Sequence, residues 1–374
     1  MQGKKIVIAA GGTGGHLFPA QALALELLEN KDQIEVLFAG TGLSSNRYFS
    51  KEQFRFQDIL SSTPFRGKWS KSLKSAWTIA KGVKQGLRVL QEFKPDVVVG
   101  FGSFHSFPVL LAAVYKKIPI VLFESNSEPG HVNRFFSRWA KFSAVQFAKA
   151  SDSLFGKTIE VAMPLWQSQK KDFYDRKELG VYFSLDPHLM TFLIFGGSQG
   201  AVSINHLFCE AALLLKKQGF DFQVIHLAGN EKEVSLVSSF YAEQGIRAFV
   251  KSFEPEMSKA WAFSSLAICR AGAATLAELL SYEVPGILIP YPHAMKDHQQ
   301  KNAQFFESVI GGAVILPENG LSASLLCSTI HDLLEPQESR LKKMQEALAL
   351  FKTKEQKQTL STLILELAHA ARKD

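Results

Sequence analysis

The stretch KKIVIAAGGTGGH at residues 4–16 predicts a buried β-strand that runs into a glycine-rich turn and then a helix. A second stretch of the same kind, FLIFGGSQGA at residues 192–201, begins the other half of the chain. Turns of this type follow the first strand of doubly wound parallel sheets. We therefore expect two such domains, each with a glycine turn at the carboxyl end of its first strand, and we expect both turns to face a shared central cleft.

Short apolar runs alternate with helix-patterned segments along most of the chain, as is typical of βαβ units. The strands expected in the first half cover residues 4–10, 34–39, 54–59, 96–100, 118–123 and 143–147. Those expected in the second half cover residues 190–195, 222–228, 247–250, 266–269, 286–290 and 313–316. The predicted fold class is α/β, with two Rossmann-like, doubly wound parallel-sheet domains.

The domain boundaries follow from a change in composition. Residues 164–187 are polar and lack the pattern of a buried strand, so they are expected to link the two domains. The N-terminal domain then covers residues 1–163 and the C-terminal domain residues 188–352. Residues 353–374 predict a C-terminal helix that packs back toward the N-terminal domain. Its apolar stripe consists of Leu360, Leu363, Ile364 and Leu367.

The composition is that of a globular protein. Hydrophobic residues make up 46% of the 374 residues and charged residues 21%, which excludes a disordered or fibrous protein. The three cysteines lie far apart, so neither a disulfide framework nor a structural zinc site is expected, and a reduced, cytosolic setting fits best. No apolar run reaches the roughly 18 residues that span a bilayer, and the start of the chain does not resemble a signal peptide.

One segment carries a charge excess equal to the net charge of +7: eight basic residues and one acidic residue lie between Arg66 and Lys94. Helical spacing places an apolar stripe on the other side, made of Trp69, Leu73, Trp77, Ala80, Val83, Leu87 and Leu90. An amphipathic helix packed on its own domain accounts for the stripe. The near absence of acidic residues favours anionic lipid headgroups as a partner. The candidate membrane residues are Phe65, Trp69, Lys71, Lys74, Trp77 and Lys81.

The glycine turn of the second half is a candidate diphosphate site. Backbone N–H groups and the positive end of the helix dipole hold an anion at such a turn, and Ser198 adds a hydroxyl donor. The alternative is that the glycines only permit tight packing of the strand against the helix.

Two further stretches of the second half follow predicted strands. In CRAGAATLAE at residues 269–278, Glu278 lies about one turn into a helix, where its carboxylate can accept hydrogen bonds from a ribose diol. The amides in DHQQKN at residues 297–302 suit sugar hydroxyls, because each both donates and accepts. A solvated helix residue and a polar helix cap are the alternatives.

The first half offers a base and a carboxylate. His16 directly follows the glycines at a helix start, where the dipole disfavours the imidazolium and so keeps the neutral ring available as a base. Glu124 and Asn126 end another strand and are expected at the same edge of the sheet. As alternatives, His16 is only a helix-start donor, and Glu124 is a loop carboxylate that caps the helix near His131.

Together these motifs resemble one family along almost the whole chain. Residues 11–16 with Pro19 and Ala20, residues 196–201, residues 269–278, and residues 297–299 with Asn302 and Ala303 are similar to the bacterial N-acetylglucosaminyltransferases that convert lipid I to lipid II. The resemblance implies a GT-B fold, with UDP-N-acetylglucosamine in the C-terminal domain and the undecaprenyl-linked lipid I at the N-terminal domain. It also implies a peripheral protein at the anionic cytoplasmic face of the cell inner membrane, with other cell-wall synthesis proteins as partners.

The resemblance also implies site residues. Those expected to touch UDP-N-acetylglucosamine are Thr13, Gly14, Gly15, Asn126, Ser198, Glu254 through its main chain at the uracil, Ala273, Ala274, Thr275, Leu276, Ala277, Glu278 and Gln299. Further candidates are Gln199, Arg270, Gln300 and Asn205. We assign His16 as the base, with Glu124 and Asn126 positioning the acceptor. No D-x-D pair that would hold a nucleotide-sugar metal is present, so neither a metal nor a cofactor is expected.

Other functions are weighed against this hypothesis. The nearest is a UDP-N-acetylglucosamine epimerase of the same fold. A degenerate sugar-nucleotide-binding protein is the next, because Phe123 and Trp166 stand where the family typically has His and Arg. A dinucleotide-dependent oxidoreductase is disfavoured, since no G-x-G-x-x-G occurs. Nucleic acid is not an expected partner, because no DNA- or RNA-binding motif accompanies the basic segment.

Overall fold

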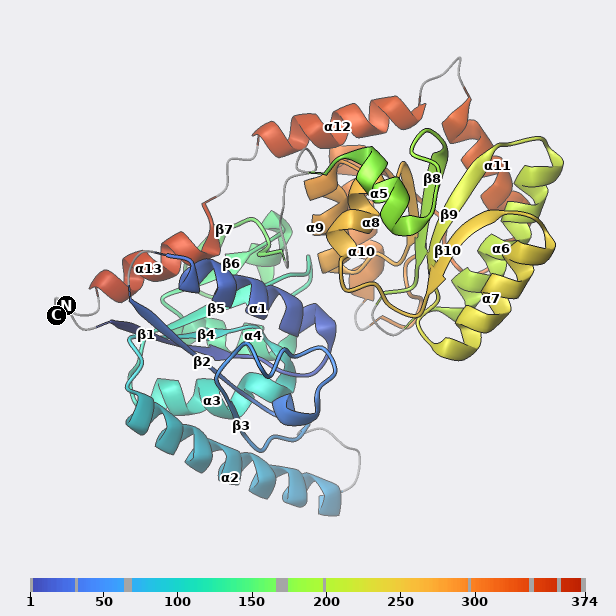
Figure 1. The fold of residues 1–374 in the computed structure, drawn as a ribbon. Coiled ribbons are helices and arrows are strands. Elements are labelled where there is room, and N and C mark those ends of the chain that lie inside the picture. The colour runs from blue at the N-terminus through green and yellow to red at the C-terminus, as the bar shows by residue number, and fades with distance from the viewer. Residues whose placement is uncertain are drawn as a thin grey trace. The chain divides into compact units, whose positions relative to one another are not determined.

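The computed structural model describes residues 3–30, 33–63, 69–165, 174–197, 200–294, 297–335, 340–354 and 358–370, with residues 69–73 and 354 as backbone only (Figure 1). The chain divides into two compact units. Unit 1 comprises Met1–Trp166 and Lys357–Asp374, and unit 2 comprises Gln167–Gln356. The chain therefore leaves unit 1 once and returns to it at its C-terminal end.

Unit 1 is built on a seven-stranded parallel sheet of order β3-β2-β1-β4-β5-β6-β7. Its strands are β1 (Lys4–Ala9), β2 (Ile34–Gly40), β3 (Phe56–Asp58), β4 (Val97–Gly100), β5 (Ile120–Glu124), β6 (Phe142–Val145) and β7 (Thr158–Glu160). Its helices are α1 (Gly14–Leu28), α2 (Trp69–Phe93), α3 (Ser103–Tyr115), α4 (His131–Phe136) and α13 (Leu360–Ala370). Central strands such as β4 are buried along their whole length, which explains their unbroken apolar sequence.

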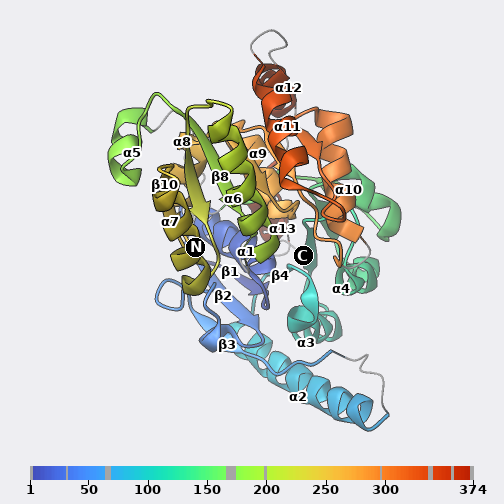
Figure 2. The ribbon, with the colours of Figure 1, turned by 90° about the vertical axis from the view of Figure 1, so that its right-hand side faces the viewer.

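Helices cover both faces of this sheet. Figure 1 shows α1 and α13 on one face and α3 with α2 on the other. Helix α13 buries Leu360, Leu363 and Ile364, and Ser361 donates a hydrogen bond to Glu26 of α1 at 2.8 Å. Helix α2 packs along α3 at the outside of unit 1 (Figure 2).

Unit 2 has a six-stranded parallel sheet of order β10-β9-β8-β11-β12-β13. Its strands are β8 (Met190–Phe195), β9 (Phe222–Leu227), β10 (Arg247–Lys251), β11 (Leu266–Cys269), β12 (Gly286–Leu288) and β13 (Ala313–Ile315). Its helices are α5 (Arg176–Phe183), α6 (Val202–Lys217), α7 (Glu231–Glu243), α8 (Met257–Phe263), α9 (Ala273–Tyr282), α10 (His298–Phe305), α11 (Ala323–Leu334) and α12 (Arg340–Lys354). The predicted pair of doubly wound α/β units is confirmed.

The order of the strands locates the crevice of each unit. In unit 1 the chain moves outward in one direction from β1 and in the other from β4, and in unit 2 the same reversal falls between β8 and β11. Doubly wound sheets bind ligands outside the carboxyl ends of the strands at such a switch point. Both predicted glycine turns begin there, because they follow β1 and β8.

Two elements fall outside the predicted pattern. Strand β7 has only three residues, lies at the sheet edge and is partly exposed, so it has no run of buried residues to reveal it. Helix α5 lies within the stretch expected to be a linker. Asp175 caps it by accepting a hydrogen bond from the N–H of Lys177 at 2.9 Å, and Phe183 is buried against Phe249 and Phe263.

The apolar stripe predicted for α2 is only partly right. Leu90 is buried, but Trp77 is 62% exposed and Ala80 is exposed as well. Val83 and Leu87 pack against the core, and two glycines of the helix also make close contacts. A Cβ added to Gly82 would lie 1.8 Å from the Leu60 carbonyl oxygen, and one added to Gly86 would lie 3.2 Å from the Cβ of Ala112 in α3. The backbone approaches its neighbours along these glycines, which leaves Trp77 on the outer side.

Candidate active site

His16 lies in the first turn of α1 at the switch point of unit 1. Its Nδ1 is 2.9 Å from the carbonyl oxygen of Phe101, the residue that follows β4. A carbonyl oxygen only accepts, so Nδ1 carries the hydrogen and Nε2 of the neutral ring carries the lone pair. The ring therefore has the tautomer that a base requires, and its hydrogen bond joins the ends of β1 and β4.

The imidazole of His105 lies against the glycine turn that follows β1. A Cβ added to Gly11 would lie 2.8 Å from the Cβ of His105, and one added to Gly12 would lie 3.0 Å from its Nδ1. Ser103, whose φ of 66° is left-handed, places its Oγ 2.7 Å from the same Nδ1. Burial lowers the pKa of His105, and the charge of His16 lowers it further. His105 was not among the predicted site residues, although its place just after the buried strand β4 was a usable signal.

Thr13, Gly14 and Gly15 form the start of α1. Thr13 is the N-cap residue and its side chain is exposed. Its carbonyl oxygen accepts the N–H of His16 at 3.1 Å. The three residues predicted to touch the nucleotide sugar thus lie directly before the candidate base.

Glu124 is buried, and both of its oxygens are engaged by its own loop. Oε1 accepts hydrogen bonds from the backbone N–H and the side-chain amide of Asn126, at 3.0 and 3.3 Å. Oε2 accepts from the N–H of Gly130 and from the amide of Asn133, at 3.0 and 2.9 Å. Burial raises the pKa of Glu124, against the effect of these donors. The carboxylate organises the turn before α4 and places Asn126, which agrees with the alternative of a capping loop carboxylate.

In unit 2 the glycine turn after β8 is tight. A Cβ added to Gly196 would lie 2.2 Å from the backbone nitrogen of Ala201. Gly197 and Gly200 have φ values of 82° and 72°, and the N–H of Gly200 donates to the Gly197 carbonyl at 2.9 Å. Ser198 and Gln199, both predicted site residues, lie outside the described residues. Helix α6 begins two residues after the turn, so its positive end lies at the switch point.

Helix α9 begins on the other side of that switch point, after β11. Its first turn, which includes Ala273 and Ala274, has no acidic side chain to oppose an anion. Thr275, Leu276 and Ala277 are buried within the helix, and the N–H of Leu276 donates to the Gly272 carbonyl at 3.0 Å. Glu278 is half-buried and accepts a hydrogen bond from Nε1 of Trp261 at 3.0 Å. Burial raises its pKa to about 7, against the lowering effect of that hydrogen bond.

Gln299, Gln300 and Glu254 are further predicted site residues of unit 2. Gln299 lies in α10 and accepts the backbone N–H of Tyr291 at 2.9 Å, and Gln300, next to it, is half-buried. Glu254 is fully buried after β10, where its carboxylate accepts hydrogen bonds from Tyr182 and from the N–H of Glu256. Its backbone therefore lies at the carboxyl edge of the same sheet, held by its own side chain.

Asn205 is not a ligand residue. It is fully buried in α6, where its amide donates to the Ala228 carbonyl at 3.1 Å and to Glu233 at 2.9 Å. Its Oδ1 lies 3.1 Å from Nε2 of His226. The prediction that Asn205 touches the nucleotide sugar is wrong, because every polar atom of this side chain is engaged inside unit 2.

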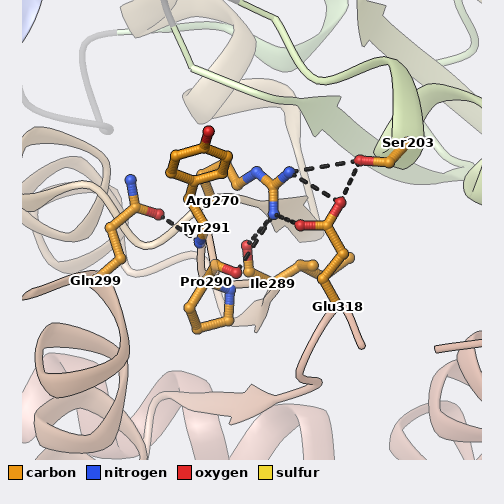
Figure 3. A network of polar contacts seen from close by, with 7 residues as sticks. All are labelled: Ser203, Arg270, Ile289, Pro290, Tyr291, Gln299 and Glu318. Carbon is orange, nitrogen blue, oxygen red and sulfur yellow. Dashed lines mark hydrogen bonds and ion pairs between the residues drawn. The ribbon is translucent and has the colours of Figure 1, made fainter. Parts of the chain in front are cut away.

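Arg270 is also engaged within the protein (Figure 3). It is 7% exposed and follows β11. Its guanidinium pairs with the carboxylate of Glu318, with Nη1 to Oε2 at 2.7 Å and Nη2 to Oε1 at 3.2 Å. Nη1 also donates to the carbonyls of Ile289 and Pro290, at 3.1 and 3.3 Å. The prediction of Arg270 as a ligand residue is therefore replaced by a structural role.

The basic helix is only partly described. Lys74 and Trp77 are exposed, and Nζ of Lys81 lies 3.4 Å from the centroid of the Trp77 ring. Phe65 and the side chains of Trp69 and Lys71 lie outside the described residues. No helix in the described part of the chain is both long and apolar enough to cross a bilayer. Among the described residues, no group of three or more His, Cys, Asp or Glu side chains is arranged to hold a metal ion.

Two family models match the chain. The glycosyltransferase family 28 N-terminal domain matches residues 6–145, and the glycosyltransferase family 28 C-terminal domain matches residues 191–361. Among curated proteins, the chain is 41% identical over 363 residues to the "UDP-N-acetylglucosamine--N-acetylmuramyl-(pentapeptide) pyrophosphoryl-undecaprenol N-acetylglucosamine transferase" of Protochlamydia amoebophila, covering 97% of this chain and 96% of that protein. It is 37% identical to the protein of the same name from Chlamydia felis, covering 93% and 94%.

Solved structures agree in fold. The crystal structure of Acinetobacter baumannii MurG is similar with a TM-score of 0.73 and 25% identity, covering 99% of this chain and all of that one. Phytolacca americana UGT2, solved as a complex with UDP-2fluoro-glucose and pterostilbene, is similar in fold alone, with a TM-score of 0.69 at 14% identity.

Proposed function

The chain belongs to glycosyltransferase family 28, and from this premise we propose that it moves N-acetylglucosamine from UDP-N-acetylglucosamine to the 4-hydroxyl of the muramoyl sugar on undecaprenyl diphosphate. This reaction converts lipid I to lipid II in peptidoglycan synthesis. The names of the curated relatives support it, since they describe an N-acetylglucosamine transferase whose acceptor is a pyrophosphoryl-undecaprenol. The observation on which the mechanism rests is the hydrogen bond between His16 Nδ1 and the Phe101 carbonyl.

His16 serves as the general base. In a single in-line displacement the acceptor hydroxyl attacks the anomeric carbon, the bond to UDP breaks, and the configuration inverts to a β-linkage. Nε2 takes the hydroxyl proton as the new bond forms. The Phe101 carbonyl keeps Nδ1 protonated and stabilises the imidazolium that results. Glu124 acts through Asn126, whose position it sets with two hydrogen bonds, and Asn126 orients the reacting sugars.

Unit 2 binds the donor. The positive ends of α6 and α9 converge on the switch point of its sheet and stabilise the diphosphate as charge develops on it. The carboxylate of Glu278 accepts hydrogen bonds from the ribose diol, and the backbone at Glu254 meets the uracil. Gln299 contacts the transferred sugar through its amide. In this mechanism the helix dipoles hold the leaving group.

We propose that α2 holds the protein at the cytoplasmic face of the inner membrane as a peripheral protein. The exposed Trp77 with Lys81 above its ring is an amphipathic pair suited to the headgroup region. Lys74 and Lys81 add attraction to anionic lipids, about 1 kcal/mol for each basic residue near the surface. Such contact would hold unit 1, the unit that carries His16, at the membrane that contains the lipid acceptor.

The test is transfer of radiolabelled N-acetylglucosamine from the UDP sugar to a short-chain lipid I analogue, with and without divalent metal. We expect labelled disaccharide lipid and one UDP per transfer, with no requirement for metal. A parallel reaction without acceptor distinguishes the epimerase, which would change the free UDP sugar. UDP binding without transfer to any acceptor would favour the sugar-nucleotide-binding protein instead.

A further inference from the structure

Arg270 lies at the centre of the carboxyl edge of the unit 2 sheet. Figure 3 shows its guanidinium between the side chain of Glu318 and the backbone that follows β12. In the sheet, β11 lies between β8 and β12. Arg270 directly follows β11, so it lies between the proposed diphosphate turn after β8 and the residues after β12 that lead to Gln299. Its pairing with Glu318 lowers the pKa of that carboxyl group, which favours the ionised carboxylate.

One arm of this network reaches the proposed diphosphate turn. Ser203, the second residue of α6, donates its hydroxyl hydrogen to Oε1 of Glu318 and lies 3.4 Å from Nη2 of Arg270. The helix α6 directly follows the glycine turn at residues 196–200. A shift of Ser203 would therefore move the start of α6, which follows the proposed diphosphate turn.

The other arm reaches the proposed sugar contact. Arg270 holds the carbonyls of Ile289 and Pro290, and the next residue, Tyr291, donates its N–H to Oε1 of Gln299. The guanidinium also lies 5.4 Å from the centroid of the Tyr291 ring. This bond fixes the orientation of the amide, because Oε1 must face Tyr291 and the NH2 group must face the other way, as Figure 3 shows.

From these contacts we propose that Arg270 and Glu318 are positioning residues that couple the diphosphate turn to the sugar-binding amide of Gln299. The inference rests on the proposed function, since it assigns both arms to one donor pocket. We do not assign the pair to contact with the substrate, because both Nη groups of Arg270 are engaged by Glu318, Ser203 and two carbonyls. Instead, the pair sets the positions of groups that contact it.

The experiment measures the affinity of the full chain for three ligands: uridine, UDP and UDP-N-acetylglucosamine. The variants are Arg270→Lys, which keeps the positive charge but loses the paired donors of the guanidinium, and Glu318→Gln, which removes the negative charge. Both should weaken UDP binding by at least about tenfold, weaken UDP-N-acetylglucosamine further, and leave uridine within about twofold. A loss caused only by lower stability would affect all three ligands equally.

A milder variant separates the two arms. Ser203→Ala removes only the link to α6, so it should weaken UDP while leaving the ratio of UDP-N-acetylglucosamine to UDP affinity unchanged. It also keeps the proposal testable if the buried Arg270 variant fails to fold.

Glu283→Gln is the matched control. Glu283, the C-cap residue of α9, forms an ion pair with Lys352 of α12 that also has a 2.7 Å contact. This variant should leave all three affinities unchanged.

The outcomes separate the inference from the function. If Glu318→Gln folds and binds UDP as the unmodified chain does, or if it weakens uridine as much as UDP, the positioning role is wrong while the proposed function stands. If the unmodified chain binds no uridine compound, the proposed function is wrong and the inference falls with it.

Discussion

Trp261 in α8 donates its indole hydrogen to the carboxylate of Glu278 in α9 at 3.0 Å. The indole is fully buried, so the carboxylate it holds is drawn toward the interior, and burial raises the pKa of Glu278 to about 7. A carboxylate proposed to bind the ribose is thus close to half-protonated at neutral pH. We therefore expect donor binding to depend on pH.

UDP affinity should fall as the pH drops below about 7. The ionised carboxylate accepts hydrogen bonds from both ribose hydroxyls, whereas the protonated form has lost an acceptor. The association constant should therefore approach a tenfold loss per pH unit below the pKa. Calorimetry with UDP between pH 5.5 and 8.5 measures this, and Glu278→Gln should remove the Glu278 component while retaining the titration of UDP itself. A profile identical in the two proteins would exclude Glu278 as the ribose ligand.

His16→Ala should lower turnover roughly 100-fold or more and leave UDP binding nearly intact. The base acts only as the acceptor hydroxyl reacts, so its loss appears in kcat. The comparison is His131→Ala, an exposed histidine at the start of α4, which should retain activity. Full turnover in His16→Ala would remove the base assignment.

Replacing Lys74 and Lys81 with Ser should weaken binding to vesicles that contain anionic lipids and make the remaining binding less sensitive to salt. Co-sedimentation at several salt concentrations measures both effects. The matched control is Lys217→Ser with Lys232→Ser, which removes the same charge from exposed positions of unit 2. Equal losses in the two double variants would show that total charge, and not α2, governs the attraction.

Gly196 and Gly197, the first two glycines of the turn after β8, should respond differently to substitution by Ala. Gly197 has a φ of 82° but no atom within 4 Å of an added Cβ, so Gly197→Ala should cost about 1–2 kcal/mol of unfolding free energy from backbone strain alone. In Gly196→Ala the new Cβ would meet the Ala201 backbone at 2.2 Å, which should cost about 3 kcal/mol or more and abolish UDP binding. Urea unfolding followed by circular dichroism compares them. Equal losses would mean that the turn relaxes around the Cβ.

The local sequence pattern was sufficient to predict the central strands, because such strands of a parallel sheet are buried on both faces and have unbroken apolar sequences. It failed for β7, a short edge strand, and was only partly right for α2, where Leu90, Val83 and Leu87 pack on the core but Gly82 and Gly86 also make close contacts. An apolar stripe shows which side chains avoid water, but not where a backbone can approach closely.

The sequence predicted individual site residues, but not the residues to which their side chains are hydrogen-bonded. The tautomer of His16 depends on Phe101, which is 85 residues away, and the role of Arg270 depends on Glu318, 48 residues away. Such pairs follow from the order of strands in the sheet. Asn205 was misassigned for the same reason, since its neighbours His226 and Glu233 belong to other elements.

The return of the chain to unit 1 through α13 means that the half of the molecule carrying His16 is not encoded by one continuous piece of the gene. A fragment cut after unit 1's first segment would expose the surface that Leu363 and Ile364 cover, and would leave Glu26 without Ser361. To produce that half alone, an engineer would have to splice the last helix onto it, for example by circular permutation.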